Sequence, residues 1–161
     1  MTRQPNLEIE RKFLVTGTDY RDTAESQHHM IQGFLSRDPH RVVRVRVSGQ
    51  QAWLTIKGAS SADATSRFEW EKAISKDEGM ALLELCLPGK IEKVRYRVTY
   101  SGFCFEVDEF FGENQGLIMA EIELTHPEEP FDRPNWLGQE VTEDFRYYNA
   151  QLSQNPFSQW A

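Results

Sequence analysis

Hydrophobic and polar residues alternate with a period of two along most of the chain, which is the pattern of β-strands with two unlike faces. We predict seven or eight strands with hairpin-like spacing, including a turn at Ser101-Gly102. The alternating runs are residues 7–13, 43–47, 53–57, 68–71, 93–98, 103–108 and 120–124. The proline-rich residues 127–134 are predicted to form a loop, and residues 18–30 a short helix.

Two further segments are predicted to be helices that interrupt the strands. Ser75 followed by Glu78 has the spacing of a capping box, and Pro88-Gly89 stops this helix. Its apolar face consists of Met80, Leu82, Leu83 and Leu85. Near the C-terminus, Thr142 is predicted to cap a second helix. This second helix carries Phe145, Tyr148, Asn149 and Leu152.

Composition limits the functions that these strands can serve. The chain has 161 residues, a net charge of −7 and 12% aromatic residues, which favours one compact domain over residues 1–161. The acidic balance argues against coating nucleic acid, because such binding depends on excess basic charge. Cys86 and Cys104 are too few for a disulfide scaffold, and no apolar run is long enough for a signal peptide or a membrane span. We therefore expect a cytoplasmic protein that binds neither nucleic acid nor membrane.

The polar face of the predicted strands is ionised at nearly every position. Its charged residues are Glu8, Glu10, Glu69, Glu71, Glu106, Asp108, Glu121, Glu123, Lys12, Arg44, Arg46, Lys57, Lys93, Arg95 and Arg97. One interpretation is a solvated sheet face crossed by ion pairs. The other is a closed barrel that is charged inside and apolar outside, with helices over the apolar stripe and room for one small ligand.

The segregation of acids and bases onto different strands favours the closed barrel. A lumen with this many fixed charges needs a highly charged partner, because a desolvated ion without a partner is costly. A triphosphate with divalent cations meets that need. Arg and Lys bind phosphate oxygens, and carboxylates bind Mg²⁺ or Mn²⁺ through oxygen.

Ordered motifs along the chain resemble those of a known family. Glu8-Ile9-Glu10-Arg11-Lys12 is similar to the N-terminal E-x-E-x-K signature of the CYTH domain, that is, of the triphosphate tunnel metalloenzymes. Further segments follow in the family's order: Gln32-Gly33-Phe34-Leu35, Arg44-x-Arg46, Leu54-Thr55-Ile56-Lys57, Glu69-x-Glu71, Lys93-x-Arg95-Tyr96, Glu106-x-Asp108, Ala120-Glu121-x-Glu123 and Val141-Thr142-x-x-x-Arg146-Tyr147. The resemblance runs nearly end to end and is strongest to stand-alone bacterial inorganic triphosphatases.

The resemblance implies an α+β fold: an eight-stranded antiparallel β-barrel with a charged lumen and a few helices packed outside. It also implies metal-dependent cleavage of inorganic tripolyphosphate or another small triphosphate, with Mg²⁺ or Mn²⁺ as the cofactor. Members of the family are often homodimers, and a monomer is the alternative state of assembly.

Roles of individual residues are carried over from the family by position. The implied metal ligands are Glu8, Glu10, Glu121 and Glu123, with Asp108 next. The implied phosphate-binding residues are Lys12, Arg44, Arg46, Lys57, Lys93 and Arg95, with Arg146 at the tunnel mouth. Lys93, Lys12 and Glu10 are the implied catalytic residues. Glu69, Glu71 and Glu106 are supporting residues that act as ligands, position water or pair with the tunnel bases.

The sequence departs from the family at Phe34, where relatives often carry a tyrosine that pairs with the lysine equivalent to Lys93. Loss of that hydroxyl removes a hydrogen-bond partner of the lysine, so we expect an altered rate or metal preference. A general base for the attacking water is either Lys93, with its pKa lowered by cations such as Arg95, or a carboxylate.

Four alternatives to the inorganic triphosphatase stay open. The first is a class IV-type adenylate cyclase, although no nucleoside-recognition motif is evident. The second is a thiamine triphosphatase, which needs an aromatic platform such as Trp53, Trp136 or Trp160. The third is a non-catalytic polyphosphate-binding module, which the retained acidic residues oppose. The fourth is a lipocalin-like barrel with an apolar lumen, since periodicity alone does not say which face is inside.

Overall fold

The computed structural model describes residues 6–160 of the chain. Within them the strands are β1 (Leu7–Val15), β2 (Ser26–Ser36), β3 (Val42–Ser48), β4 (Gln51–Ser60), β5 (Ser66–Ile74), β6 (Ile91–Tyr100), β7 (Phe103–Phe110), β8 (Ile118–Glu123) and β9 (Leu137–Glu140). The helices are α1 (Tyr20–Thr23), α2 (Lys76–Leu85) and α3 (Asn149–Gln154). Short 3₁₀ turns are η1 (Gly112–Asn114), η2 (Phe145–Tyr147) and η3 (Phe157–Gln159). No helix in the described range has the length and apolarity needed to cross a membrane.

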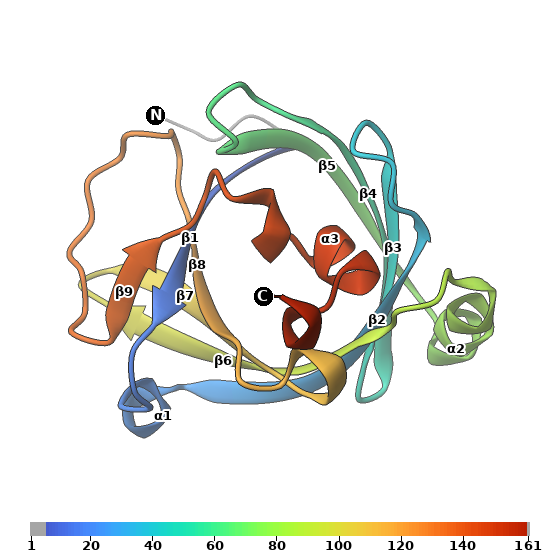
Figure 1. Cartoon of the computed structure of the whole chain (residues 1–161), viewed down its shortest axis with the longest axis horizontal. Coiled ribbons are helices and arrows are strands. Elements are labelled where there is room, and N and C mark those ends of the chain that lie inside the picture. The colour runs from blue at the N-terminus through green and yellow to red at the C-terminus, as the bar shows by residue number, and fades with distance from the viewer. Residues whose placement is uncertain (1–5, 161) are drawn as a thin grey trace.

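The strands form one antiparallel sheet that curls until its ends meet (Figure 1). β1 closes the ring because it pairs with β5 on one edge, from Leu7 to Ile9, and with β8 on the other, from Glu10 to Leu14. β9 pairs with β1 beyond the end of β5. The predicted eight-stranded antiparallel barrel is therefore confirmed, with a ninth strand added outside the ring.

The barrel wall is charged inside and apolar outside. Successive side chains of a strand point to opposite faces. On β1, Glu8 and Lys12 line the lumen, whereas Ile9 and Phe13 belong to a buried apolar cluster on the outer face. The alternation along the chain thus separates a charged lumen from an outer hydrophobic core, and the lipocalin-like alternative with an apolar lumen is wrong.

The covering of the outer face differs in part from the expected layer of helices. Over β1, β7 and β8 the cover is mainly the loop after β8, whose Trp136 packs edge-on against Phe105 with ring centroids 5.5 Å apart. Over β3 and β4 the cover is α2, which buries Leu83. Loops reach this outer face because the wall's own strands carry most of the apolar area and need only a few aromatic side chains to exclude water.

Helix α2 begins as the sequence predicts but buries less of its apolar face. Ser75 and Glu78 form the complete capping box. Gly79 lets the helix approach β4 closely, because a Cβ at this position would lie 2.6 Å from the Cβ of Ala52. Of the four predicted apolar residues, Leu83 is buried and Leu82 partly buried, whereas Met80 and Leu85 are exposed.

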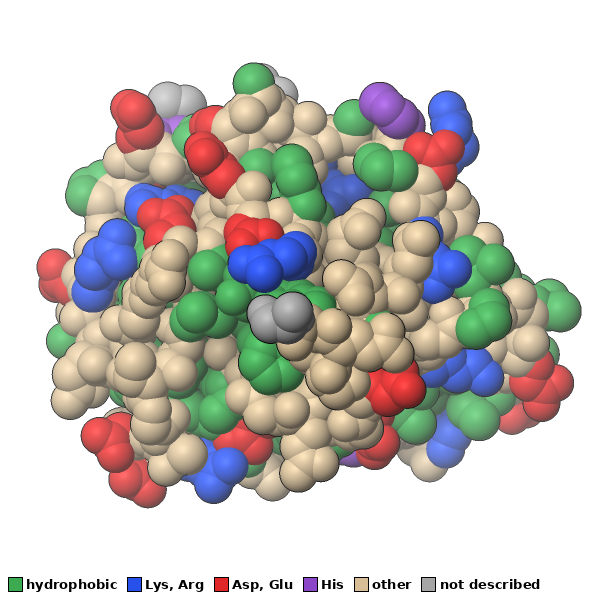
Figure 2. All heavy atoms as spheres, viewed as in Figure 1, with side chains coloured by type: hydrophobic (Ala, Val, Ile, Leu, Met, Phe, Trp, Pro, Cys, Tyr) green, Lys and Arg blue, Asp and Glu red, His purple; other side chains and the backbone are tan. Residues whose placement is uncertain are grey.

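The C-terminal segment, residues 141–160, packs across one end of the barrel. In Figure 1 its helix α3 lies inside the ring of strands as seen from this end, and in Figure 2 side chains fill the middle of the same end. Tyr147 and Leu152 belong to a buried cluster together with Phe34 of β2 and Ile91 of β6. The segment therefore fixes the shape of the lumen at this end.

Two local predictions need correction, and a third is confirmed. Only Tyr20–Thr23 of residues 18–30 is helical, because the stretch from Ser26 belongs to β2 and is held by backbone pairing with β6. Thr142 does not cap a helix: its hydroxyl accepts the Lys12 amide hydrogen and donates to Glu140. The predicted turn at Ser101-Gly102 is confirmed, and both residues have positive φ, as two-residue hairpin turns require.

Candidate active site

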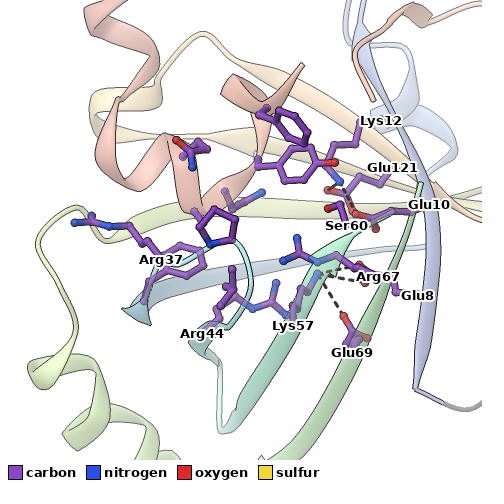
Figure 3. Close-up of a pocket in the computed structure, with 18 of the residues that line it drawn as sticks. Glu8, Glu10, Lys12, Arg37, Arg44, Lys57, Ser60, Arg67, Glu69 and Glu121 are labelled. Carbon is purple, nitrogen blue, oxygen red and sulfur yellow. Dashed lines mark hydrogen bonds and ion pairs between the residues drawn. The ribbon is translucent and has the colours of Figure 1, made fainter. Parts of the chain in front are cut away.

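The barrel encloses a cavity of about 700 Å³ that is lined by charged side chains. This volume lies within the range of small-molecule sites. Every charged residue predicted on the polar face of the strands lines it except Asp108, which lies behind Lys93 and Arg95. Figure 3 shows Glu8, Glu10, Lys12, Lys57 and Glu121 converging from different strands.

The charges divide the lumen into two walls. The strands β7, β8, β1 and β5 are neighbours in the ring and form what we call the acidic wall. Its carboxylates are Glu106, Asp108, Glu121, Glu123, Glu8, Glu10, Glu69 and Glu71. The strands β4, β3, β2 and β6 form the basic wall. Its cations are Lys57, Arg44, Arg46, Lys93, Arg95 and Arg97, and the exceptions to the division are Lys12 and Arg67, which lie on the acidic wall.

Ion pairs join the two walls where a basic strand meets an acidic one. At the β4–β5 border, Lys57 Nζ lies 3.0 Å from Glu8 Oε1 and 3.3 Å from Glu69 Oε2. At the β6–β7 border, Glu106 lies 3.4 Å from Arg95 and 3.2 Å from Arg97. These contacts neutralise much of the charge at the borders.

In the middle of the acidic wall, Lys12 is held between two carboxylates. Its Nζ hydrogen-bonds to Glu10 and lies 3.9 Å from Glu121. Burial opposes the charge, but Glu10 and Glu121 raise the pKa of Lys12, which stays protonated. Burial and the neighbouring Glu10 raise the pKa of Glu121. Burial and Glu8 also oppose ionisation of Glu10, yet Lys12 and Lys57 hold its pKa below the ordinary value.

Also at the β6–β7 border, Asp108 of β7 is the shared counter-ion of two cations of the basic wall. Arg95 binds it through both oxygens, at 2.8 and 2.9 Å, and Lys93 Nζ lies 2.8 Å from it. Burial opposes the charge of Asp108, but Arg95 and Lys93 hold its pKa well below the ordinary range. Burial lowers the pKa of Lys93 to about 7, with Arg95 and Arg46 acting in the same direction against Asp108.

Four side chains of this site, two neutral and two charged, were assigned no role from the sequence. Gln32 on β2 and Asn149 on α3 hydrogen-bond to each other and to cations of the basic wall. Arg37 and Arg67 also line the cavity. Gln32 lies on the polar face of β2, but hydrophobic and polar residues do not alternate regularly along that strand. Its place in the site was therefore hard to predict from the sequence.

The aromatic residues expected at a substrate platform lie elsewhere. None of Trp53, Trp136 and Trp160 lines the cavity as described for residues 6–160. Trp136 is buried in the outer core, and Trp160 packs edge-on against Tyr147. The aromatic residues that do line the cavity are Phe34, Phe145 and Tyr148. The ring of Tyr148 lies 4.6 Å from Lys12 Nζ.

Arg146 lies outside the cavity, in contrast to its expected place at the tunnel mouth. Its guanidinium forms an ion pair with Asp144 and lies 4.7 Å from the ring of Trp160. Its side chain is exposed on the outside of the C-terminal segment.

The carboxylates of the acidic wall fit a divalent cation in their chemistry, although they do not form a complete cage. Among residues 6–160, no group of three or more Asp, Glu, His or Cys side chains is arranged to hold a metal ion by itself. Glu10 and Glu121, however, are each only 14% exposed, and the same lysine, Lys12, approaches both. Two all-oxygen ligands of this kind suit Mg²⁺, which commonly takes one or two carboxylates and completes its shell with phosphate oxygens and water.

A closed antiparallel barrel with an acidic and a basic wall around one cavity defines a tunnel protein for a small polyanion. The CYTH domain matches residues 6–154, and the chain belongs to that family. It is 45% identical over 151 residues to an inorganic triphosphatase of Acetivibrio thermocellus, which covers 93% of this chain and 95% of that one. It is 33% identical to the inorganic triphosphatase of Nitrosomonas europaea, over 91% of this chain and 96% of that one.

Solved structures agree with this assignment. The crystal structure of the inorganic triphosphatase NE1496 superposes with a TM-score of 0.65 at 31% identity, over 91% of this chain and 93% of that one. A putative adenylyl cyclase from Hippeastrum, HpAC1, superposes with a TM-score of 0.61 at 18% identity over 75% of this chain. The second similarity shows a shared fold only. Triphosphatases of the family are metal-dependent.

Proposed function

We propose that the chain hydrolyses inorganic tripolyphosphate, or another small triphosphate, inside its barrel with a divalent metal ion. The observation that carries this proposal is the row of cations on adjacent strands that faces carboxylates across one cavity. A linear triphosphate has negative charge along its whole length, which cationic side chains and a bound metal ion together neutralise. Two inorganic triphosphatases that match this chain over nearly their whole length support the same substrate class.

The basic wall is proposed to hold the phosphate chain. Its phosphate-binding residues are Arg44, Arg46, Lys57, Lys93 and Arg95, with Lys12 on the opposite wall. Guanidinium groups bind phosphate oxygens as forks, and lysines act as compact point charges. Phosphoryl transfer needs little covalent chemistry from the protein, so positioning and charge neutralisation do most of the work. Arg146 is omitted from this set because it binds Asp144 on the outer surface.

The acidic wall is proposed to hold the metal ion. Glu10 and Glu121 are the central ligands, and Glu8 and Glu123 flank them on the same strands. When bound there, Mg²⁺ or Mn²⁺ supplies charge neutralisation at the phosphates and lowers the pKa of a water molecule. Asp108 is proposed as the counter-ion of Lys93 and Arg95 instead of a ligand, since both of its oxygens are already engaged.

The remaining acidic residues have simpler proposed roles. Glu121 accepts the proton of the attacking water, because a carboxylate with a raised pKa is a stronger base than an ordinary one. Glu69, Glu71 and Glu106 are ion-pair partners of the basic residues. Glu71 Oε2 lies 3.5 Å from Arg44, and the other two lie at the borders described above.

The test is phosphate release from tripolyphosphate, ATP and thiamine triphosphate, each with Mg²⁺, with Mn²⁺ and with chelator. We expect turnover that favours tripolyphosphate and stops with chelator. Glu10→Gln is expected to abolish it, since the variant loses a central metal ligand. Conversion of ATP to cyclic AMP and pyrophosphate would replace the proposal with the cyclase. Tight binding without turnover under every metal would replace it with a polyphosphate-binding module.

Further properties complete the proposal. We propose Mg²⁺ or Mn²⁺ as the ion, one functional domain over residues 1–161, a cytoplasmic location and no nucleic acid or membrane partner. Homodimer formation is the expected assembly from the family. Sedimentation of the purified chain decides between dimer and monomer.

A further inference from the structure

Strand β2 contributes an uncharged residue to the middle of the basic wall. Gln32 is fully buried between strands β3 and β6, which carry the arginines and lysines of this wall. Its Oε1 accepts a hydrogen bond from Arg46 Nε at 2.9 Å, and its Nε2 donates to Asn149 Oδ1 at 2.8 Å. The amide is thus polarised with its oxygen toward a cation.

Asn149 continues this connection to the second cation. It is the first residue of α3, and the same Oδ1 accepts a hydrogen bond from Lys93 Nζ at 3.0 Å. Two neutral amides therefore link Arg46 on β3 with Lys93 on β6. We call Gln32 and Asn149 the amide bridge.

We propose that the amide bridge positions Arg46 and Lys93 for the triphosphate without cancelling their charge, an inference that rests on the proposed function. Two neighbouring cations repel each other, and an amide oxygen beside each one lowers that cost. A carboxylate in the same place would also lower it but would remove positive charge that the phosphates need.

The count of hydrogen-bond donors supports this role. Lys93 has three N–H groups, of which one binds Asp108 and one binds Asn149, so one stays available for a phosphate oxygen. Arg46 has five N–H groups, and Gln32 accepts the one on Nε. The bridge occupies donors at the back of each cation and fixes the direction in which the others point.

The bridge also gives the C-terminal segment a role in the site. Asn149 is held in place because Leu152, one turn later on the same helix, is buried among apolar residues of the barrel end. The segment that closes this end of the barrel therefore supplies one of the two amides. Displacement of α3 would leave Lys93 and Gln32 without their shared acceptor.

The test compares Asn149→Asp with Asn149→Ala. The aspartate keeps an oxygen next to Lys93 and nearly the same shape, but it adds a negative charge. We expect it to raise KM for tripolyphosphate more than alanine does, whereas a merely structural role predicts that the isosteric aspartate is the milder change. Loss of a hydrogen bond to a charged group corresponds to about 10-fold to 100-fold in kcat/KM for Asn149→Ala. Gln154→Ala, at an exposed position of the same helix, is the matched control and is expected to behave as wild type.

A double-mutant cycle tests whether the two amides act together. We expect Gln32→Ala with Asn149→Ala to lose little more activity than the worse single variant, because the two residues form one connection. Thermal melts of every variant show whether the fold survives. Independent, additive losses would overturn the bridge, as would an Asn149→Asp variant that is closer to wild type than Asn149→Ala.

Calorimetric binding of metal-free tripolyphosphate separates this proposal from the proposed function. If the wild type binds tripolyphosphate but cleaves it with neither Mg²⁺ nor Mn²⁺, the hydrolase fails, and the bridge still predicts weaker binding to Asn149→Asp than to Asn149→Ala. The reverse order of affinity overturns the bridge alone. A wild-type chain that neither binds nor cleaves tripolyphosphate overturns both.

Discussion

The two walls of the lumen stabilise their charges by different means. On the acidic wall, lysines reach the carboxylates directly: Lys12 binds Glu10, and Lys57 binds Glu8. On the basic wall, Lys93 and Arg95 share the carboxylate Asp108, and Arg95 also lies 3.4 Å from Glu106. Neutral amides accept further hydrogen bonds from Lys93 and Arg46. The basic wall therefore keeps positive charge at Arg46 and Lys93, whereas Lys12 offsets part of the negative charge in the middle of the acidic wall.

Two buried lysines show the consequence of this difference. Burial by itself lowers the pKa of both, because a desolvated ammonium is costly. The carboxylates around Lys12 reverse that effect and raise its pKa, whereas the arginines around Lys93 add to it and bring its pKa to about 7. The comparison teaches that the positive charge, and with it the demand for a bound anion, is concentrated on the basic wall.

The largest expected effect is on Asp108, the buried carboxylate that Lys93 and Arg95 share. Asp108→Asn leaves Arg95 and Lys93 buried without their counter-ion, and removal of one partner from a buried ion pair costs about 3–5 kcal/mol of unfolding free energy. Urea denaturation measures this. Glu71→Gln, in a half-exposed pair with Arg44, is the control and is expected to cost less than about 1 kcal/mol. Equal losses in the two variants would contradict the contrast between a buried and a half-exposed ion pair.

The next prediction separates the walls by what each binds. Lys12→Met frees Glu10 and Glu121 from their cation, so we expect tighter binding of Mn²⁺ in the absence of substrate. Lys93→Met removes a cation from the basic wall, so we expect weaker binding of metal-free tripolyphosphate and little change for Mn²⁺. Both variants are expected to lose about 100-fold or more in kcat/KM, the usual effect of removing a transition-state charge contact.

Calorimetry of each variant with each ligand distinguishes the two effects. Similar changes in metal affinity for both lysine variants would mean that metal binding and phosphate binding are not separated between the two walls.

Acid titration tests the depressed pKa of Asp108. The unfolded chain takes up a proton at this group near its ordinary value of about 3.9, whereas the folded chain resists protonation to a lower pH. Stability from this group is therefore complete above that value and declines as the pH falls below it, by about 1–3 kcal/mol. Urea midpoints between pH 5 and pH 2 measure the decline. We expect a shallower decline in Asp108→Asn, and an equally steep one would assign the acid sensitivity to other carboxylates.

The walls also show how far the sequence alone leads. Alternation with charged residues at every second position predicts the strands, and Glu8, Arg44 and Lys93 all line the lumen as expected. Alternation does not say which strands become neighbours. The ring order that places β7, β8, β1 and β5 side by side depends on closure between the first and fifth strands, which is a long-range contact.

Residues outside the alternating strands were harder to predict. Asn149 reaches Lys93 because the C-terminal segment packs back over the barrel end, and its sequence shows only a short helix. Asp108 has the spacing of a lumen carboxylate, yet it lies behind the lining residues because it forms ion pairs with two cations, Lys93 and Arg95. Partners of this kind follow from three-dimensional packing and from the cost of an unpaired buried charge.

The smallest expected effect concerns Phe34, which lines the cavity from β2 on the basic wall, two residues after Gln32. Its ring is buried against apolar neighbours at the closed end, so a hydroxyl there enters a largely apolar site close to cations. We expect Phe34→Tyr to keep its fold and to change kcat or the ratio of Mg²⁺ to Mn²⁺ activity by about 2-fold to 10-fold, the value of one neutral hydrogen bond. Steady-state kinetics with both metals measure it. Unchanged kinetics under both ions would mean that the amide bridge already meets the hydrogen-bonding needs of Lys93, so that a tyrosine adds nothing to the basic wall.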